Sequence, residues 1–270
     1  MKYCRFLLDE QVHYGVVEER RGELWITGPA DAPEEDLAYR LAMEQAAAGS
    51  FDFEPMPLTS ARLLPPVTPS KIICVGRNYR DHVKELGNEM PAQPLLFLKP
   101  PSCLLEPGGV VRLPAASERV DFEGELALVI GRRVRNLKPE DDWKSVIRGY
   151  TLANDISARD LQKKDVQWAR AKGWDTFGPV GPIVSDELDG AAGLTIETRL
   201  NGEVRQHAST EDFIFTIPTL LQFISAAFTL EPGDLILTGT PSGVGPLEPG
   251  DRVEVEIAGL SVLVNTVEAE

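Results

Sequence analysis

Short apolar runs separated by glycine and proline constrain the fold of this chain more than any other feature. The 270 residues include 23 Gly and 21 Pro, which interrupt helices and central strands. Between these breaks the runs are short and rich in β-branched residues, a pattern typical of strands. With 43% hydrophobic residues, the chain is long enough to bury a sizeable core. We therefore expect a mainly β protein with some short helices.

The first 65 residues are predicted to form a small β-rich domain. Three alternating segments indicate a meander, with a tight turn at Arg21-Gly22: residues 3–8, 14–18 and 23–26. A helix is predicted over Pro33–Ala48, because Pro33 and the three acids after it suit a first helical turn. Prolines then cluster between residues 55 and 69. They predict a boundary near residue 65, with a second domain over residues 66–270.

In the second domain, hydrophobic period and turn signals predict a series of strands with four helices between them. The strand that matters most covers residues 122–130, and Asn201-Gly202 predicts a hairpin between residues 194–200 and 203–206. The predicted helices are Arg80–Leu86, Pro139–Val146, Asp160–Ala171 and Ile217–Ala227.

The charge balance excludes several classes of partner. There are 42 Asp and Glu residues against 27 Lys and Arg, which gives a formal net charge of −15. Such a surface repels nucleic acid and anionic membranes, and no stretch of uncharged apolar residues is long enough to span a bilayer. The three cysteines lack CxxC spacing, and the N-terminus shows no signal or transit pattern. We therefore expect a cytoplasmic protein.

Three carboxylates form the most informative pattern. Glu123 and Glu125 are two residues apart in a predicted strand, so they share a face. Asp155 follows the apolar run 150–154. Three oxygen ligands from two strand ends suit Mg2+, which keeps open positions for a substrate. The alternatives are a solvated strand face for the two glutamates and a helix N-cap for Asp155.

Cationic and amide side chains follow Asp155 along the chain. Arg159 and Gln162 come one to two helical turns later, where they would hold an anionic substrate against the metal. A surface salt bridge is the alternative for Arg159. Lys172 lies in a glycine- and aromatic-rich segment and would donate to a developing oxyanion. Its alternative is an ordinary solvated lysine.

His82 and Glu85 are three residues apart on the predicted helix 80–86. At this spacing the carboxylate can orient the imidazole and raise its basicity, so that His82 activates a water as general base. A surface pair is the alternative. Residues 87–91 after the helix suggest a lid over the site. Phosphate-loop, GxSxG and HExxH motifs are absent from the sequence.

Taken together, these motifs resemble the fumarylacetoacetate hydrolase family over residues 66–270. The segments that carry the resemblance are residues 76–79 (GRNY) with His82 and Glu85, 97–100 (FLKP), 121–126 (DFEGEL), 149–151 and 154–160 (GYT and NDISARD), 175–177 (DTF) and 238–245 (TGTPSGVG). The N-terminal 65 residues more loosely resemble the small β domain of some bacterial members.

The resemblance implies a mixed β-sandwich roll, a homodimer, and one Mg2+, with Mn2+ or Ca2+ as alternatives. It implies that the substrate is a small anionic 2-keto acid and that the protein takes part in aromatic catabolism. The family pattern assigns metal ligands to Glu123, Glu125 and Asp155, catalysis to His82, Glu85 and Lys172, and substrate contacts to Arg159, Gln162 and Thr240. Fumarylacetoacetate hydrolase itself has a substrate-contacting tyrosine where this chain has Val166, which argues against fumarylacetoacetate as substrate.

The leading hypothesis is hydrolysis of a carbon–carbon bond in an acylpyruvate-like 2,4-diketo acid through an enolate. Decarboxylation or tautomerisation of oxaloacetate-like acids, or isomerisation of hydroxymuconate-type diacids, is the alternative and uses the same metal motif. A third hypothesis is a non-catalytic acidic β-domain protein that binds a metabolite or a partner.

Overall fold

Strands account for most of the secondary structure, as the glycine and proline pattern predicts. The computed structural model describes residues 1–31, 33, 36 and 53–270. Its strands are β1 (Lys2–Leu8), β2 (Gln11–Arg20), β3 (Glu23–Pro29), β4 (Met56–Pro57), β5 (Arg62–Leu64), β6 (Ile72–Gly76), β7 (Leu95–Lys99), β8 (Leu104–Leu105), β9 (Val110–Leu113), β10 (Val120–Phe122), β11 (Gly124–Ile130), β12 (Ile147–Asn154), β13 (Ser157–Ala158), β14 (Gly178–Ser185), β15 (Thr195–Leu200), β16 (Glu203–Ser209), β17 (Leu235–Leu237), β18 (Gly245–Pro246), β19 (Arg252–Ile257) and β20 (Ser261–Ala269).

The described helices are short apart from α5. They are α2 (Arg80–Glu85), α3 (Arg159–Lys164), α4 (Ala169–Lys172) and α5 (Ile217–Ala227), with 3-10 turns η1 (Leu58–Ser60), η2 (Pro101–Cys103), η3 (Trp143–Val146) and η4 (Thr210–Asp212). None of these helices is long and apolar enough to cross a membrane. The predicted helix Pro33–Ala48 lies outside the described residues, except for residues 33 and 36.

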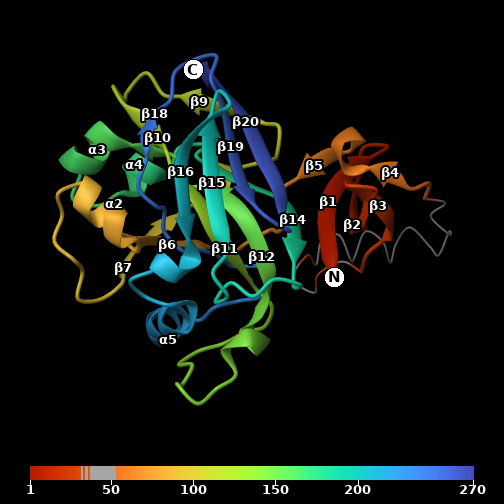
Figure 1. Ribbon diagram of the computed structural model, residues 1–270, viewed down its shortest axis with the longest axis horizontal. Coiled ribbons are helices and arrows are strands. Elements are labelled where there is room, and N and C mark those ends of the chain that lie inside the picture. The colour runs from red at the N-terminus through yellow and green to blue at the C-terminus, as the bar shows by residue number, and fades with distance from the viewer. Residues whose placement is uncertain (32, 34–35, 37–52) are drawn as a thin grey trace.

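Two large sheets pack face to face in the centre of the molecule (Figure 1). The longer sheet has the order β4-β3-β2-β1-β14-β12-β11-β17-β6-β7, and β16-β15-β19-β20-β9 form the second. Strands β11 and β12 of the first contact β15 and β19 of the second. Together with a small third sheet, β13-β10-β18, this arrangement confirms the mixed β-sandwich roll.

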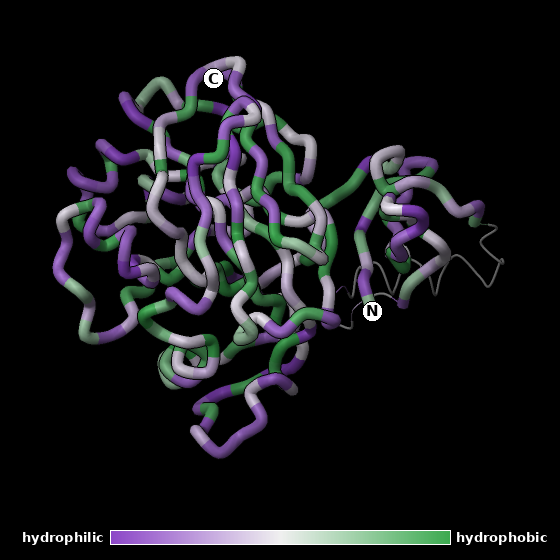
Figure 2. Tube along the Cα trace, in the orientation of Figure 1, coloured by the Kyte–Doolittle hydropathy of each residue, from purple (hydrophilic) through white to green (hydrophobic). Residues whose placement is uncertain are grey.

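Strand β11 is buried on both faces of the long sheet. Leu126 and Leu128 pack in the core cluster between the two sheets, and Ala127 and Val129 pack in a second cluster on the opposite face. The apolar residues are correspondingly concentrated along the central strands (Figure 2). A charged side chain at the end of this strand is therefore surrounded by protein rather than by water.

The chain changes sheets at Glu123. The predicted single strand over residues 122–130 is wrong at this point, because β10 pairs with β13 and β18, whereas β11 pairs with β12 and β17. Gly124 allows the change: a Cβ there would lie 2.1 Å from Oγ1 of Thr198 on the facing sheet. The backbone of Glu123 is thus free of the strand ladder and bonds to the end of β12 instead.

Two of the predicted helices are wrong in form. Residues 139–146 contain only the 3-10 turn η3, because the Asp142 carboxylate accepts the backbone N–H of Lys144 and favours a turn. Residues 160–171 form two short helices, α3 and α4. The break begins at Asp165, whose carboxylate accepts two hydrogen bonds from Arg170 at 2.8 and 2.9 Å across the gap.

The predicted meander and the Asn201-Gly202 hairpin are confirmed. Strands β1, β2 and β3 pair in sequence, and β15 pairs with β16 across Asn201-Gly202, where both residues have positive φ angles. Strand β1 also pairs with β14, so the N-terminal strands extend the long sheet while lying to one side of the remaining fold (Figure 1). The division at residue 65 stays a prediction.

Candidate metal centre and active-site pocket

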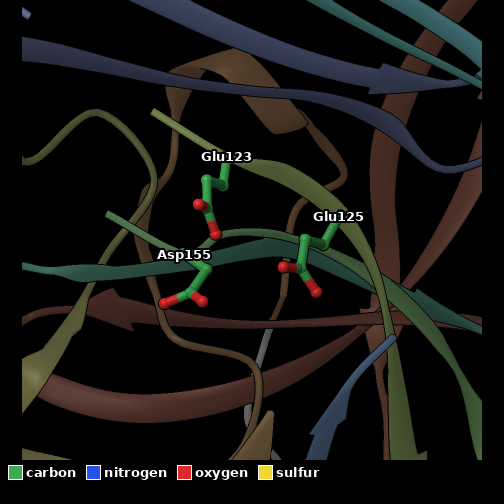
Figure 3. A group of neighbouring side chains, drawn as sticks. All are labelled: Glu123, Glu125 and Asp155. Carbon is green, nitrogen blue, oxygen red and sulfur yellow. The ribbon is translucent and has the colours of Figure 1, made fainter. Parts of the chain in front are cut away.

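Three buried carboxylates meet at the ends of two neighbouring strands. Glu123 lies at the sheet change, Glu125 on β11, and Asp155 directly after β12. One oxygen from each lies within 4.8 Å of the others, and the three side chains point toward a common centre (Figure 3). Their exposed fractions are 5%, 2% and 1%. A solvated strand face is therefore wrong for Glu123 and Glu125.

Backbone hydrogen bonds hold two of these acids in register. The N–H of Glu123 donates to Oδ1 of Asn154 at 2.8 Å, and the N–H of Asp155 donates to the carbonyl of Glu123 at 2.8 Å. Asp155 does not cap α3, whose N-cap residue is Ala158 with no side-chain cap bond. Its carboxylate is instead available to the cluster.

Two lysines enter this cluster, and both are almost completely buried. Lys172 Nζ donates to Glu123 Oε2 at 2.8 Å and to Asp155 Oδ2 at 2.6 Å. Lys99 Nζ donates to Asp155 Oδ1 at 2.6 Å and to the carbonyl of Phe177 at 2.8 Å. Burial requires such pairing, since an uncompensated charge is costly away from water. The solvated-lysine reading of Lys172 is wrong.

Arg159 forms a second ionic layer around Glu123. Its guanidinium forms an ion pair with Glu123 and donates through Nε to Asp121 Oδ2 at 2.8 Å. Nη1 donates to Gln162 Oε1 at 2.9 Å, so the arginine orients the amide. Arg159 is 7% exposed, which rules out the surface salt bridge to Asp155 or Asp160.

The two glutamates differ in their electrostatic surroundings. Burial opposes ionisation of Glu123, but the charges of Arg159 and Lys172 outweigh it and hold the pKa of Glu123 below its ordinary value. Burial, together with the negative charges of Asp155 and Glu123, raises the pKa of Glu125 well above its ordinary value. Glu125 has one described hydrogen bond, from the backbone N–H of Gly239 at 2.6 Å. The centre thus lacks positive charge on the side of Glu125.

This deficit fits a divalent cation. The donor set is three carboxylates, which is the ligand chemistry of Mg2+, Mn2+ and Ca2+. A cation between the acids would compensate Glu125, which the lysines do not reach in any described hydrogen bond. The triad can therefore hold a divalent metal.

His82 is buried and lines the same pocket as the carboxylates, whereas its partner Glu85 is exposed. His82 is 4% exposed, and its Nδ1 is 3.1 Å from Glu85 Oε2. The other carboxylate oxygen of Glu85 accepts the N–H of Gly243 at 2.9 Å. The helix α2 and the segment 238–245 thus fix the dyad from two sides. The surface-pair reading is wrong for His82, whereas Glu85 is exposed.

One pocket of about 290 Å³ joins these groups. It is lined by eight of the nine residues proposed for the site: His82, Glu123, Glu125, Asp155, Arg159, Gln162, Lys172 and Thr240. Glu85 reaches it through His82. Val166 is 95% exposed and lies outside the lining, so the structure does not place this position in the pocket wall.

Thr240 is held more tightly than the resemblance implies. Its hydroxyl donates to the carbonyl of Gly124 at 2.9 Å and accepts from Gln206 Nε2 at 2.8 Å. Because a hydroxyl carries a single proton, the Oγ1 of Thr240 has none left to donate to a substrate carboxylate in this arrangement. The side chain ties the segment after β17 to the start of β11.

Several residues of the site were missed by sequence reasoning. Lys99 has a signal, since it ends the apolar run 95–98 just before two prolines. Asp121 precedes the glutamates, but nothing local marks its pairing with Arg159 and Arg119. Gln206 is more than 80 residues away from Gly124, whose N–H it accepts at 3.0 Å. Only the packing of the two sheets places it there.

A family model confirms the resemblance noted from the motifs. The model for the C-terminal domain of fumarylacetoacetate hydrolase matches residues 71–268. The chain belongs to the fumarylacetoacetate hydrolase family of enzymes. The match covers every residue of the carboxylate cluster and the His82–Glu85 pair.

Relatives that are named for an activity differ in the reaction they catalyse. The mitochondrial oxaloacetate tautomerase FAHD1 of Arabidopsis thaliana is 43% identical over 204 residues, which are 74% of this chain and 91% of the relative. A 2-hydroxyhepta-2,4-diene-1,7-dioate isomerase from Mycobacterium marinum matches with a TM-score of 0.84 and 40% identity, covering 100% of this chain and 99% of its own.

A second similar structure was solved with a metal. It is the maleylpyruvate hydrolase of Sphingobium sp. SYK-6 in complex with manganese(II) ion and pyruvate. It matches with a TM-score of 0.76 and 34% identity, covering 100% of this chain and 99% of its own. Tautomerase, isomerase and hydrolase activities therefore all occur among proteins similar to this one.

Proposed function

We propose that this chain is a divalent-metal-dependent enzyme that interconverts the enol and keto forms of 2-keto acids. The observation that carries the proposal is the buried triad Glu123, Glu125 and Asp155 in one pocket with the buried His82, whose Nδ1 lies 3.1 Å from Glu85 Oε2. Support also comes from the tautomerase and isomerase named above. The proposal thus places enol–keto interconversion before hydrolysis, whereas the leading hypothesis from the sequence was hydrolysis.

Glu123, Glu125 and Asp155 would hold the metal, with Mg2+ or Mn2+ as the preferred ions. The manganese ion in the similar hydrolase structure supports a divalent ion. A cation bound here acts as a Lewis acid and withdraws electron density from a 2-keto oxygen, which acidifies the adjacent carbon. The remaining steps are assigned to side chains of the protein.

His82 would move the proton. Its Nδ1 is engaged by Glu85, so Nε2 is the nitrogen left to accept a proton from C3 of the substrate and to return one to it. Tautomerisation then requires only that C3 loses a proton while the 2-oxygen gains one. Lys172 Nζ, which lies between two of the acids, would stabilise negative charge on that oxygen.

The Arg159–Gln162 pair would orient the substrate. Asp121 fixes the guanidinium at 2.8 Å, and the guanidinium in turn fixes the Gln162 carbonyl oxygen at 2.9 Å. Because the amide oxygen of Gln162 is occupied by Arg159, its NH2 group remains available to donate to a substrate carboxylate. A substrate held in this way presents one face of C3 to the proton carrier.

Hydrolysis of an acylpyruvate is the second candidate, and the anchored dyad favours it. Gly243 and His82 hold both carboxylate oxygens of Glu85, an arrangement suited to a general base. His82 would take a proton from water, the hydroxide would add to the distal carbonyl, and the C3–C4 bond would break. Its electron pair would pass to the pyruvate part, which then takes up a proton at C3.

The test is an assay of three reactions with one protein preparation. Enol absorbance of 2-hydroxyhepta-2,4-diene-1,7-dioate and of enol oxaloacetate reports tautomerisation, and pyruvate release from acetopyruvate or oxaloacetate reports cleavage or decarboxylation. We expect rapid loss of enol absorbance that EDTA abolishes and Mg2+ or Mn2+ restores. Enol turnover that is unaffected by thorough chelation would contradict the proposal.

A control variant separates catalysis from simple binding. Glu123→Gln removes a proposed metal ligand while keeping the side-chain shape, so turnover should fall by at least about a hundred-fold. If the protein only bound a metabolite, Glu123→Gln would leave ligand affinity unchanged and no 2-keto acid would be consumed.

A further inference from the structure

Gln206 is a polar side chain that lies on β16 of the second sheet and has an exposed fraction of 0%. A buried amide is costly unless it is hydrogen-bonded. The three described hydrogen bonds of Gln206 all leave its own sheet. Its Oε1 accepts the N–H of Gly124 at 3.0 Å. Its Nε2 donates to Thr240 Oγ1 and to the carbonyl of Pro241, at 2.8 Å each.

These contacts allow the Gln206 amide only one orientation. The carbonyl of Pro241 can only accept a hydrogen bond and the N–H of Gly124 can only donate one, so the amide nitrogen and oxygen cannot be exchanged. The register between β15 and β16 shifts directly beside Gln206, and such a bulge redirects a side chain. The second sheet therefore presents this amide to the start of β11 in a defined way.

Gly124, which receives the amide, is the residue between the two glutamates of the carboxylate cluster. Gln206 holds the peptide group that joins Gly124 to Glu123. The Thr240 hydroxyl holds the peptide group on the other side, because it donates to the carbonyl of Gly124 at 2.9 Å. Since Gln206 and Thr240 are also bonded to each other, the three residues form a closed ring of hydrogen bonds, the Gly124 clamp.

The clamp acts at the point where the backbone between the two ligands is least restrained. Glycine has more backbone freedom than any other residue, and here it joins Glu123 to Glu125. The carboxylate of Glu125 is held separately, by the N–H of Gly239 at 2.6 Å. With both peptide groups of Gly124 fixed, the separation of the two carboxylates is fixed as well.

We propose that Gln206 and Thr240 are positioning residues: by clamping Gly124 they set the spacing of the two glutamates, and this spacing selects Mg2+ over Ca2+. The inference rests on the proposed function, because it takes the carboxylate triad as the metal site. Mg2+ demands short bonds and near-ideal octahedral geometry, whereas Ca2+ accepts longer bonds and variable geometry. A loosened Gly124 would therefore weaken the binding of Mg2+ more than that of Ca2+.

The experiment measures the affinity of the metal-stripped protein for Mg2+ and for Ca2+ by isothermal titration calorimetry, without substrate. Gln206→Met keeps the length of the side chain and removes all three hydrogen bonds. The dissociation constant for Mg2+ should rise about ten-fold or more, since groups that orient metal ligands contribute this much. The dissociation constant for Ca2+ should rise less, by about two-fold, so the preference for Mg2+ should fall.

Asn265 supplies a matched control on the second sheet. It is 1% exposed, and its Nδ2 donates to the carbonyls of Glu106 and Gly109 at 3.0 Å each, outside the pocket lining. Asn265→Leu also removes the hydrogen bonds of a buried amide, so the midpoint of urea unfolding in EDTA should fall in both variants. Asn265→Leu should leave both dissociation constants unchanged, whereas Gln206→Met should change them.

Thr240 gives a second test, which holds even if Gln206→Met does not fold. Thr240→Val keeps the side-chain shape and removes the hydroxyl, so its affinity for Mg2+ should fall as in Gln206→Met. Thr240→Ser keeps the hydroxyl and should retain most of the affinity. Because both side chains hold Gly124, the effects of Gln206→Met and Thr240→Val on Mg2+ binding should not add in the double variant.

The outcomes separate this inference from the proposed function. Unchanged Mg2+ affinity in Gln206→Met and Thr240→Val, or equal weakening of Mg2+ and Ca2+ binding, would overturn the selection by the Gly124 clamp. An equal loss of Mg2+ affinity in Asn265→Leu would overturn it too, because general loosening of the fold would then explain the effect. In each case the metal-dependent enol turnover of the unmodified protein would stand. Selective Mg2+ binding without enol turnover would instead overturn the proposed function and leave the clamp.

Discussion

Lys99 Nζ lies 2.6 Å from Oδ1 of Asp155, and both side chains are at most 1% exposed. This pair holds one corner of the carboxylate cluster from the side opposite Lys172. Burial opposes the charge on Lys99, but Asp155 outweighs it and raises the pKa of Lys99 above its ordinary value. The ammonium is therefore part of the site, supplied by the last residue of β7, in a segment (FLKP) that carried the family resemblance without an assigned role for Lys99.

Replacing Lys99 by Met should destabilise the metal-free protein by about 3 kcal/mol, because Asp155 loses a buried partner. The free energy of unfolding in urea measures the loss. Lys84→Met is the control. Its ion pair with Asp81 is exposed on both sides, so its loss should cost less than about 1 kcal/mol. Equal effects of the two substitutions would contradict a buried structural role for Lys99.

The two glutamates should respond differently when metal is absent. The pKa of Glu123 is held low, so its charged form stabilises the fold at neutral pH, and Glu123→Gln should cost about 2 kcal/mol in EDTA. The pKa of Glu125 is raised, so its charge is unfavourable there, and Glu125→Gln should leave stability unchanged or higher.

Titration with Mg2+ should then distinguish ligand loss from fold loss. Both glutamine variants should lose most of the rise in melting temperature that Mg2+ gives the unmodified protein. A Glu125→Gln protein that is strongly destabilised in EDTA, or one that keeps the full stabilisation by Mg2+, would contradict the assigned electrostatics.

The pH dependence of turnover should reflect the burial of His82. Burial lowers the pKa of His82, with Arg159 acting in the same direction and Glu123 and Glu85 opposing them. The neutral, proton-accepting imidazole then persists below pH 6.5, so the acid limb of kcat/KM should lie below that value. Glu85→Gln removes an opposing charge and should move the limb to still lower pH. A limb above pH 6.5 would exclude His82 as the base observed.

His82 also separates the two candidate reactions. His82→Ala should abolish pyruvate release from acylpyruvates, because hydrolysis needs an activated water. Decarboxylation of oxaloacetate needs no attacking water and should survive in part. If acylpyruvate hydrolysis were unchanged in His82→Ala, a different general base would be required.

The sheet change at Glu123 depends on Gly124. Gly124→Ala should destabilise the protein by about 2 kcal/mol, because the new Cβ would meet Oγ1 of Thr198 at 2.1 Å. Thr198→Ala removes that atom, so the double variant should recover part of the loss. The two changes should therefore be non-additive by more than about 0.5 kcal/mol when measured by urea unfolding; additivity would place the strain elsewhere.

The sequence by itself determined the elements with a strong local signal. The meander, the Asn201-Gly202 turn and the helix Ile217–Ala227 follow from periodicity and turn chemistry, and the structure has them. The three carboxylates were found from i, i+2 spacing and from an acid at a strand end. Their burial was only inferred from the apolar residues after them, since sequence shows which side chains share a face but not what covers that face.

Tertiary structure decided the rest, because charge compensation in the interior is a long-range property. The partner of Asp155 is Lys99, which lies 56 residues earlier and donates a hydrogen bond to its carboxylate. The partner of the Gly124 N–H is the side-chain oxygen of Gln206, which lies on the second sheet. In the sequence, Gly124 is only a glycine within a predicted strand. The structure shows why a side chain does not fit there, because Thr198 lies against it. Arg77 and Lys163 lie 86 residues apart along the chain, and only the fold places both at one pocket.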